Sequence, residues 1–222
     1  DAEAGDATSV TLFPARPNPN PMSDDCDGDG DRGDAPDDLA WETLGGDIDY
    51  SCPGFDVRRD DVRLPDGTET DFHYVDEPPT VVILPFTPDG DVVLVEEWRQ
   101  AVGRVNRGLP AGGVEDDDAD LAAAARRELR EETGYEPESI EPLHVVEPAN
   151  GFANSVHHYF LAHGCTPSEA TGLDLDFNES IRPVAADYAR FRDAVFAGHV
   201  RDGRAVLGVS MYEHAHDGNG ME

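Results

Sequence analysis

The chain has 222 residues, which is enough for one globular domain with a smaller attachment, and its formal net charge is −32. The charge comes from 48 acidic residues against 16 basic ones, and every basic residue is Arg. A balance this negative excludes simple electrostatic binding to nucleic acid or to an anionic membrane surface. No stretch reaches the roughly 18 to 20 consecutive apolar residues that a membrane-spanning helix needs.

Residues 1–40 differ in composition from the rest of the chain. A Pro-rich run over 14–21 is followed by an acidic, Gly-rich tract over 24–38. The tract lacks the spacing and the terminal Glu of an EF-hand calcium loop, so its composition predicts a disordered acidic tail. Because Met22 has the character of an initiator residue, we expect residues 1–21 to be an upstream extension without a folded role.

Residues 41–79 are predicted to form a small N-terminal antiparallel β-sheet. The segment from Trp41 to Val75 is typical of three short strands, and residues 64–68 (LPDGT) supply a turn with an Asp-Gly signal. A sheet of this size is not stable alone, so it must pack on the next domain or on a second subunit.

Residues 80–216 are predicted to form the main α/β domain, followed by a flexible C-terminus over 217–222. Apolar runs indicate buried strands over 80–86, 91–100, 143–148 and 155–165. Two stretches near the end have helical patterns, 184–197 ended by Gly198 and roughly 203–216.

The stretch from Leu109 to Tyr135 has the features of a loop, a helix and a second loop. At 100° per residue, Glu128, Glu131 and Glu132 fall within about 100° of arc on one helix face. Three carboxylates on one face repel one another unless a cation lies among them. The simpler alternative is a solvent-exposed helix with surface ion pairs, in which Arg127 pairs with Glu131 at i, i+4.

Residues 127–135 (RELREETGY), with Gly112 and Gly113 before the helix, resemble the Nudix box, G-x5-E-x7-R-E-U-x-E-E-x-G-U, where U is apolar or aromatic. The resemblance implies an α/β/α sandwich with a mixed sheet. It also implies a loop–helix–loop that holds Mg²⁺, or Mn²⁺, against a diphosphate linked to another moiety. The metal ligands that it implies are Glu128 and Glu132, with Glu131 sharing a metal or bracing Arg127, and the main-chain carbonyl of Ala111.

The first Glu of the box pattern is missing from this chain. Counted back from Arg127, its position falls on Ala119 if Gly113 is the family glycine. If Gly112 is that glycine, Asp118 takes the place of the Glu and the loop carries one extra residue. We favour Asp118, because a one-residue insertion in a loop costs little free energy.

Three further segments resemble ADP-ribose pyrophosphatases: residues 94–100 with 108–115, residues 147–162, and residues 172–183. The resemblance implies that Arg99 holds the diphosphate, that Gly112 lines the substrate site and that Glu179, with Asp176 behind it, activates the attacking water. Each role has a simpler alternative: Arg99 pairs with Glu96 or Glu97, and Glu179 is a solvated loop acid. Trp98 stacks on a base or belongs to the core or a dimer interface. We interpret His157 and His158 as structural.

The resemblance implies a hydrolase that cuts ADP-ribose to AMP and ribose 5-phosphate, or a related enzyme acting on another nucleotide sugar or dinucleotide. A non-catalytic nucleotide sensor of the same fold is the alternative, but the retention of all three helix glutamates favours the hydrolase. We expect a nucleoside diphosphate derivative as the small-molecule partner, no nucleic acid or membrane partner, and a homodimer assembled through residues 41–80. The acidic, lysine-free composition resembles that of haloarchaeal proteins and predicts a halophilic, cytoplasmic protein.

Overall fold

The computed structural model describes residues 38–168, 173, 175 and 180–217. Contacts between Cα atoms divide the chain into two units, residues 1–40 and 41–222. Nearly all of the predicted acidic tail and the C-terminal segment 218–222 lie outside the described residues.

The second unit contains twelve strands, three α-helices and one 3-10 helix within the described residues. The strands are β1 (Glu42–Cys52), β2 (Phe55–Arg63), β3 (Glu69–Asp76), β4 (Thr80–Pro85), β5 (Asp91–Arg99), β6 (Arg104–Gly108), β7 (Ala111–Gly113), β8 (Tyr135–Glu136), β9 (Ser139–Val146), β10 (His157–His163), β11 (Thr166–Pro167) and β12 (Ile181–Asp187). The helices are η1 (Gln100–Val102), α1 (Leu121–Thr133), α2 (Tyr188–Phe196) and α3 (Gly203–Asp217).

Strands β1, β2 and β3 form an antiparallel sheet in that order, which confirms the predicted N-terminal sheet. The β2–β3 turn closes at the expected place, where Thr68 N–H donates to the Asp66 carboxylate and Gly67 has a φ of 83°. Large apolar side chains remain exposed on this sheet, among them Trp41, Ile48 and Tyr50.

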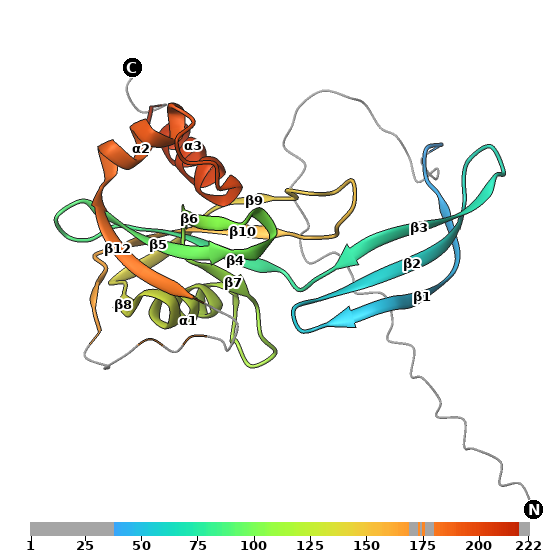
Figure 1. Cartoon of the computed structure of the whole chain (residues 1–222), viewed down its shortest axis with the longest axis horizontal. Helices are drawn as coiled ribbons and strands as arrows, with labels where there is room; N and C mark the ends of the chain where they lie inside the picture. The colour runs from blue at the N-terminus through green and yellow to red at the C-terminus, as the bar shows by residue number, and fades with distance from the viewer. Residues whose placement is uncertain (1–37, 169–172, 174, 176–179, 218–222) are drawn as a thin grey trace, which may run out of the picture. The chain divides into compact units, whose positions relative to one another are not determined.

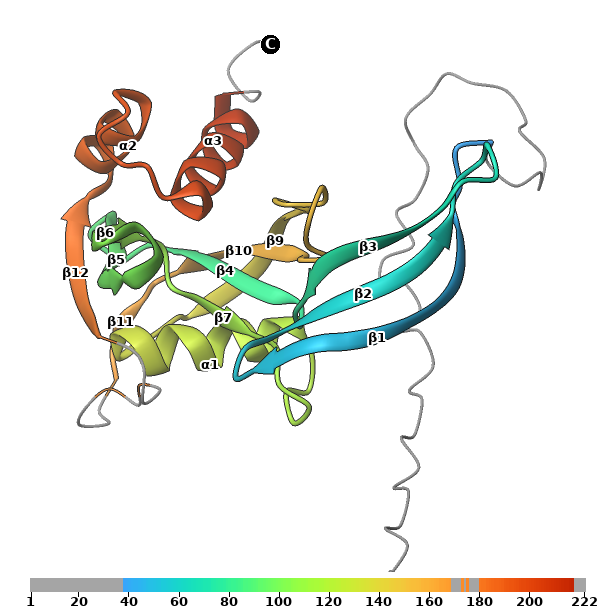
Figure 2. The same ribbon diagram turned by 45° about the vertical axis from the view of Figure 1, so that its right-hand side comes forward.

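A mixed four-stranded sheet, ordered β7-β4-β10-β9, is the centre of the α/β part of the chain. Strands β4 and β10 run parallel, whereas β7 and β9 pair antiparallel with their neighbours. Helix α1 covers one face, and α2 with α3 covers the other (Figures 1 and 2). Alternate β4 residues divide between the two cores: Val81 and Ile83 pack on the α1 side, and Val82 and Leu84 pack on the α2–α3 side. The predicted α/β/α sandwich is therefore confirmed.

A second antiparallel sheet is ordered β12-β5-β6. Its central strand, β5, ends at Arg99. The predicted helix over 184–197 is wrong in its first part, because residues 181–187 form strand β12 and α2 begins only at Tyr188. Ala185 and Ala186 favour a helix locally, and pairing of Val184 with Leu94 of β5 overrides this preference.

The end of β3 is tied to the loop between β9 and β10. Val75 N–H donates to the Phe152 carbonyl at 2.9 Å, and Asn154 N–H donates to the Val75 carbonyl at 3.0 Å. The Asn154 amide also bonds the Asp76 carboxylate at 2.6 Å and accepts from Glu77 N–H at 3.1 Å. Asn154 thus fixes the loop against the chain that leads from the N-terminal sheet into β4.

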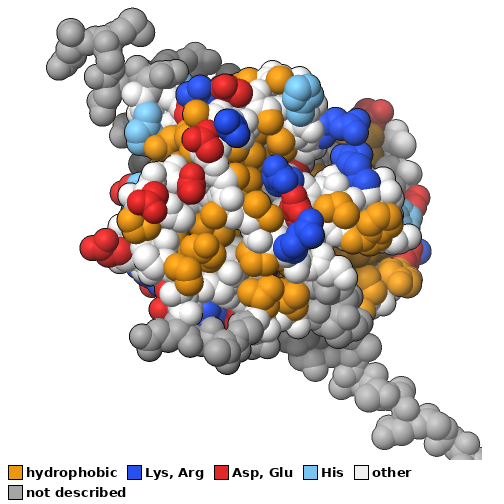
Figure 3. All heavy atoms as spheres, turned by 60° about the vertical axis from the view of Figure 1, so that its left-hand side comes forward, with side chains coloured by type: hydrophobic (Ala, Val, Ile, Leu, Met, Phe, Trp, Pro, Cys, Tyr) orange, Lys and Arg blue, Asp and Glu red, His pale blue; other side chains and the backbone are white. Residues whose placement is uncertain are grey.

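The surface combines charge with exposed apolar side chains. Figure 3 shows one face on which hydrophobic side chains lie exposed beside Arg and carboxylate groups. Across the part of the chain that the structure describes, no helix is both long and apolar enough to cross a membrane.

Candidate functional site

Helix α1 presents its acidic face because both of its ends and its apolar side are fixed. Asp120 caps the first turn by accepting from Ala123 N–H at 2.8 Å, and Gly134 ends the helix with a φ of 72°. Leu129 and its alanine neighbours are buried against β4 and β10. The remaining face of the helix turns its glutamates toward β7.

The three helix glutamates differ in their surroundings. Glu132 is only 4% exposed, and one of its carboxylate oxygens accepts from Ala111 N–H at 3.0 Å. The Glu128 carboxylate lies directly over Gly112, where a Cβ atom would be 2.3 Å from the carboxylate carbon. Glu131 is the most exposed of the three and pairs with Arg127 at 3.0 Å. The glycine at position 112 is therefore required by the close approach of a side chain.

Arg127 joins the loop before α1 to the helix. Its guanidinium donates to both oxygens of Asp118, at 3.1 and 2.8 Å, to the Gly113 carbonyl at 2.9 Å, and to Glu128 at 2.7 Å. These hydrogen bonds, led by that of Asp118, raise the pKa of Arg127. The same contact lowers the pKa of Asp118. The Asp118 side chain is only 6% exposed, whereas Ala119 is exposed, so the geometry favours Asp118 as the residue that braces the loop.

The donor types on this face suit a hard divalent cation, which prefers carboxylate and carbonyl oxygens. Glu128 lies over Gly112, and Glu132 accepts from the N–H of the adjacent Ala111, so both carboxylates face the same short stretch of β7. With Glu128 paired to Arg127, however, the described residues contain no group of three acidic, His or Cys side chains arranged around one point. The oxygen donors fit such a cation by their chemistry, and Glu128 would have to exchange Arg127 for the cation in order to bind it.

Arg99 ends strand β5 and forms an ion pair with the buried Glu97 at 2.7 Å. Burial lowers the pKa of Arg99, and the positive charge of Arg204 lowers it further. The neighbouring Trp98 is half exposed, and its indole N–H donates to the Gln100 side chain at 2.9 Å. Of the alternatives that the sequence left open for Arg99, the ion pair with Glu97 is present in the structure.

Comparison with known proteins decides the family. A NUDIX domain profile matches residues 76–203, which is more than half of the chain. The chain belongs to the Nudix hydrolase family. The match begins at the end of β3 and includes α1 and the Arg127 loop.

Two relatives and one solved structure show the degree of similarity. The chain is 31% identical over 171 residues to the ADP-ribose pyrophosphatase of Bacillus subtilis, covering 77% of this chain and 91% of that protein. It is 37% identical over 118 residues to the methanol dehydrogenase activator of Bacillus methanolicus, covering 53% of this chain and 63% of that protein. The crystal structure of an ADP compounds hydrolase superposes with a TM-score of 0.68 at 21% identity, over 81% of this chain and 96% of the other, which shows the shared fold.

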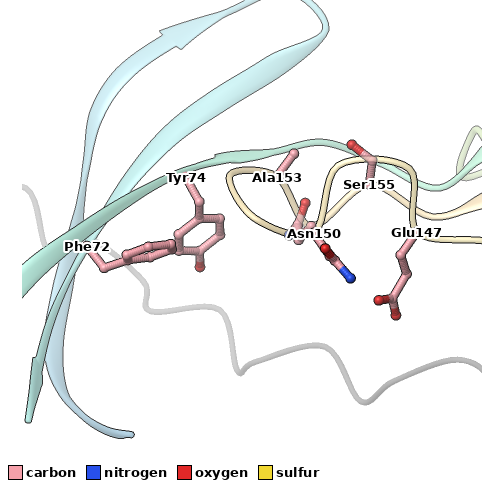
Figure 4. Close-up of a pocket in the computed structure, with 7 residues that line it drawn as sticks. Phe72, Tyr74, Glu147, Asn150, Ala153 and Ser155 are labelled. Atoms are coloured by element: carbon pink, nitrogen blue, oxygen red, sulfur yellow. The ribbon is translucent and has the colours of Figure 1, made fainter. Parts of the chain in front are cut away.

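A pocket of about 300 Å³ lies beside the Nudix core, between β3 and the loop after β9. Figure 4 shows the Phe72 and Tyr74 rings side by side on β3, with Asn150, Ser155 and Glu147 on the opposite side of the hollow. The two ring centroids are 6.3 Å apart. The sequence prediction, which stated only that this sheet must pack on the next domain or on a second subunit, missed the pocket.

The remaining predicted residues fall in two groups. Glu179 and Asp176 lie outside the described residues. His158 is buried, and His157 is half-buried with an Nδ1 atom that has no hydrogen-bond partner among the described residues. Tyr159, which the sequence prediction did not single out, lies beside His157, with the two ring centroids 6.5 Å apart. Burial lowers the pKa of His157, and the positive charge of Arg204 lowers it further.

Proposed function

We propose that this Nudix protein is a metal-dependent hydrolase that cuts the diphosphate bond of a nucleoside diphosphate linked to a second moiety. ADP-ribose, cut to AMP and ribose 5-phosphate, is the substrate that we favour. The observation that carries the proposal is the convergence of Glu128, Glu132 and the Ala111 peptide at one glycine. Similarity to an ADP-ribose pyrophosphatase over nine-tenths of that protein supports the choice of substrate.

Glu128, Glu132 and the Ala111 carbonyl are the groups that would hold Mg²⁺, with Mn²⁺ as the alternative, and Glu131 is the candidate for a further ligand. When bound, the cation neutralises the diphosphate oxygens and stabilises the charge that develops on the leaving phosphate. The protein contributes the fixed helix face, and Arg127 keeps Glu131 and the loop in place. Glu132 is the proposed ligand whose orientation is most firmly set, because it is buried and accepts a hydrogen bond from the main chain of Ala111.

Arg99 is proposed to bind the diphosphate through charge-assisted hydrogen bonds, and Gly112 to line the same site. The substrate must then share or replace the Glu97 partner of Arg99. Trp98, which is half exposed at the neighbouring position, is proposed to stack on a base. Glu179 is proposed as the residue that activates water, with Asp176 as its neighbour, on the basis of the family resemblance.

The experiment is a substrate panel in high salt with Mg²⁺: ADP-ribose, ADP-glucose, GDP-mannose, NADH and diadenosine polyphosphates. Release of AMP from ADP-ribose that stops on chelation of the metal is the expected result. Turnover of another panel member in preference to ADP-ribose would retain the hydrolase and change the substrate. Tight nucleotide binding without turnover of any member would favour the non-catalytic sensor.

We also propose a homodimer assembled through residues 41–80 in a halophilic cytoplasm. The N-terminal sheet exposes Trp41, Ile48, Tyr50 and other large apolar side chains, and β1 is an edge strand without a second neighbour in its sheet. An apolar surface of this kind needs a partner.

A further inference from the structure

The pocket beside the Nudix core has two walls that come from distant parts of the sequence. One wall is the end of β3, where the Phe72 and Tyr74 rings lie side by side, and the other is the loop between β9 and β10 (Figure 4). The loop wall carries the amide of Asn150, and the carboxylate of Glu147 lies beside it. A hollow with a flat apolar side and a polar side suits a ring-shaped organic group whose edge carries hydrogen-bonding atoms.

One side chain, that of Asn154, holds the two walls together. Its side-chain N–H donates to the Asp76 carboxylate at 2.6 Å, and its amide oxygen accepts from Glu77 N–H at 3.1 Å. Main-chain hydrogen bonds on both sides of Val75 complete the contact between β3 and the loop. Since the Asp76 carboxylate also pairs with Arg58 of β2 at 3.3 Å, the loop is tied to two strands of the N-terminal sheet.

The contact between Asn154 and Asp76 lies a short distance along the chain from the proposed metal site. Asn154 bonds the main-chain N–H of Glu77, and β4 begins three residues later at Thr80. Thr80 pairs with Gly113 of β7, the strand that the helix glutamates face. At about 3.3 Å per residue, the three residues span at most about 10 Å. The pocket and the proposed metal site are therefore connected by one short segment.

We propose that Asn154 is a positioning residue, which keeps this pocket in the shape that binds one of the ring-shaped groups joined to the substrate diphosphate. That group is the base or the ribose of the nucleotide sugar, because each has a face that packs on an aromatic ring and an edge with hydrogen-bonding atoms. Asn154 acts through Asp76 and Glu77 and does not touch the bond that is cut. The inference rests on the proposed function, and it adds a route by which the N-terminal sheet affects substrate binding.

The test exchanges the two partners of the contact. Asn154→Asp places two carboxylates at the 2.6 Å contact, where they repel each other, although Glu77 N–H still has an acceptor. Asp76→Asn alone keeps an acceptor for the Asn154 amide. The double variant, Asn154→Asp with Asp76→Asn, restores the hydrogen bond with donor and acceptor exchanged.

Asp47→Asn is the matched control. Asp47 pairs with an arginine of β2 at 3.0 Å, as Asp76 does at 3.3 Å, and it does not line the pocket. The four variants and the wild-type chain are compared in high salt with Mg²⁺. The measurements are KM and kcat for ADP-ribose, the inhibition constants of AMP and of ribose 5-phosphate, and the melting temperature.

We expect Asn154→Asp to raise KM roughly 10-fold, because a hydrogen bond to a charged partner is lost, and to change kcat less than about threefold. The kcat is retained because the proposed metal ligands on α1 and β7 are unchanged. The double variant should return KM to within about threefold of the wild-type value, and Asp76→Asn and the control should stay in that range. The inhibition constant that rises together with KM identifies the group in the pocket, AMP for the nucleoside and ribose 5-phosphate for the sugar.

Two results would overturn the positioning role and leave the proposed function intact. A lower melting temperature with unchanged KM in Asn154→Asp would show that the contact serves only the fold. A raised KM that the double variant does not recover would show that the native amide contacts the substrate directly.

If the wild-type chain hydrolyses none of the panel, the proposed function fails, and calorimetric titration with AMP and with ribose 5-phosphate tests the pocket by itself. Binding of either compound that is weakened in Asn154→Asp and recovered in the double variant supports the inference. Binding that Asn154→Asp leaves unchanged, or no binding of either compound to the wild-type chain, overturns it.

Discussion

The contact between Gly112 and Glu128 gives the sharpest test of the proposed site. In Gly112→Ala, the new methyl group would lie 2.3 Å from all three carboxylate atoms of Glu128. An ordinary contact is about 3.5 Å, so the carboxylate must move by about 1 Å. The Gly112 φ angle is not positive, so the alanine itself introduces no backbone strain.

The expected effects on activity and stability differ in size. A misplacement of about 1 Å in a catalytic group can lower the rate about 100-fold, which corresponds to about 2.7 kcal/mol of activation free energy. The displaced atoms are the end of a flexible side chain, so the free energy of unfolding should change by less than about 1 kcal/mol. The cation concentration that gives half-maximal activity should also increase, because Glu128 is a proposed ligand.

Gly113→Ala is the matched control. Its new methyl group would be 3.6 Å from Pro78, an ordinary contact, and it changes the neighbouring residue of the same strand in the same chemical way. The assay is the hydrolysis rate of ADP-ribose over a range of Mg²⁺ concentrations, together with thermal unfolding of both variants. The reasoning is refuted if Gly112→Ala keeps its rate within threefold of the wild-type chain, or if Gly113→Ala loses as much.

Four further predictions concern the box, the tail and the assembly. Glu132→Gln should lower the maximal rate by orders of magnitude with little change in melting temperature, because Gln still accepts from Ala111 N–H; more than a third of wild-type activity would contradict this. Asp118→Asn should destabilise the fold by about 2 kcal/mol in denaturant titrations near neutral pH. Because the pKa of Asp118 is lowered in the folded state, its contribution is complete above the ordinary value of 3.8 and is lost as the pH falls through the lowered pKa, so the difference between the two chains should disappear in acid. A chain that starts at Asp37 should match the full chain in activity and thermal midpoint, and a clear loss of either would show that the removed tail contributes. Light scattering should give a dimer mass in molar salt and dissociation in low salt, where the charge of −32 per chain is unscreened; a monomer mass for fully active protein in high salt would exclude the dimer.

The parts of the site that the sequence predicted are those in which local spacing determines geometry. Glu128, Glu131 and Glu132 share a face because they lie within five residues of one helix, and Gly134 marks its end. The departure at Asp118 could be weighed in the same way, because only nine residues separate it from Arg127. Such short-range relations follow from the helical repeat before any tertiary contact is considered.

The parts that the sequence could not predict depend on pairings between distant segments. Asp202, at the start of α3, lies against Gly108 of β6 only because the fold brings these distant segments together. The beginning of α2 was misplaced for the same reason, since pairing with β5 converts residues 181–187 into a strand. Neither relation leaves a periodic signal in the sequence.

Arg127 explains how the acidic face stays ordered when no cation is bound. Asp118, Glu128 and Glu131 all lie within hydrogen-bond distance of this one guanidinium, so their mutual repulsion is offset without a metal. A divalent cation at the proposed site would compete with Arg127 for Glu128, whereas Glu132 accepts from the main-chain N–H of Ala111. The guanidinium would keep the loop in place even if Glu128 left it for a cation, because Asp118 and the Gly113 carbonyl would still hold it. The bidentate Asp118 contact therefore does more than the Glu128 contact to keep Gly112 and Gly113 in position against the helix. An aspartate one residue out of register can thus brace the loop in place of the glutamate that the box pattern has and this chain lacks.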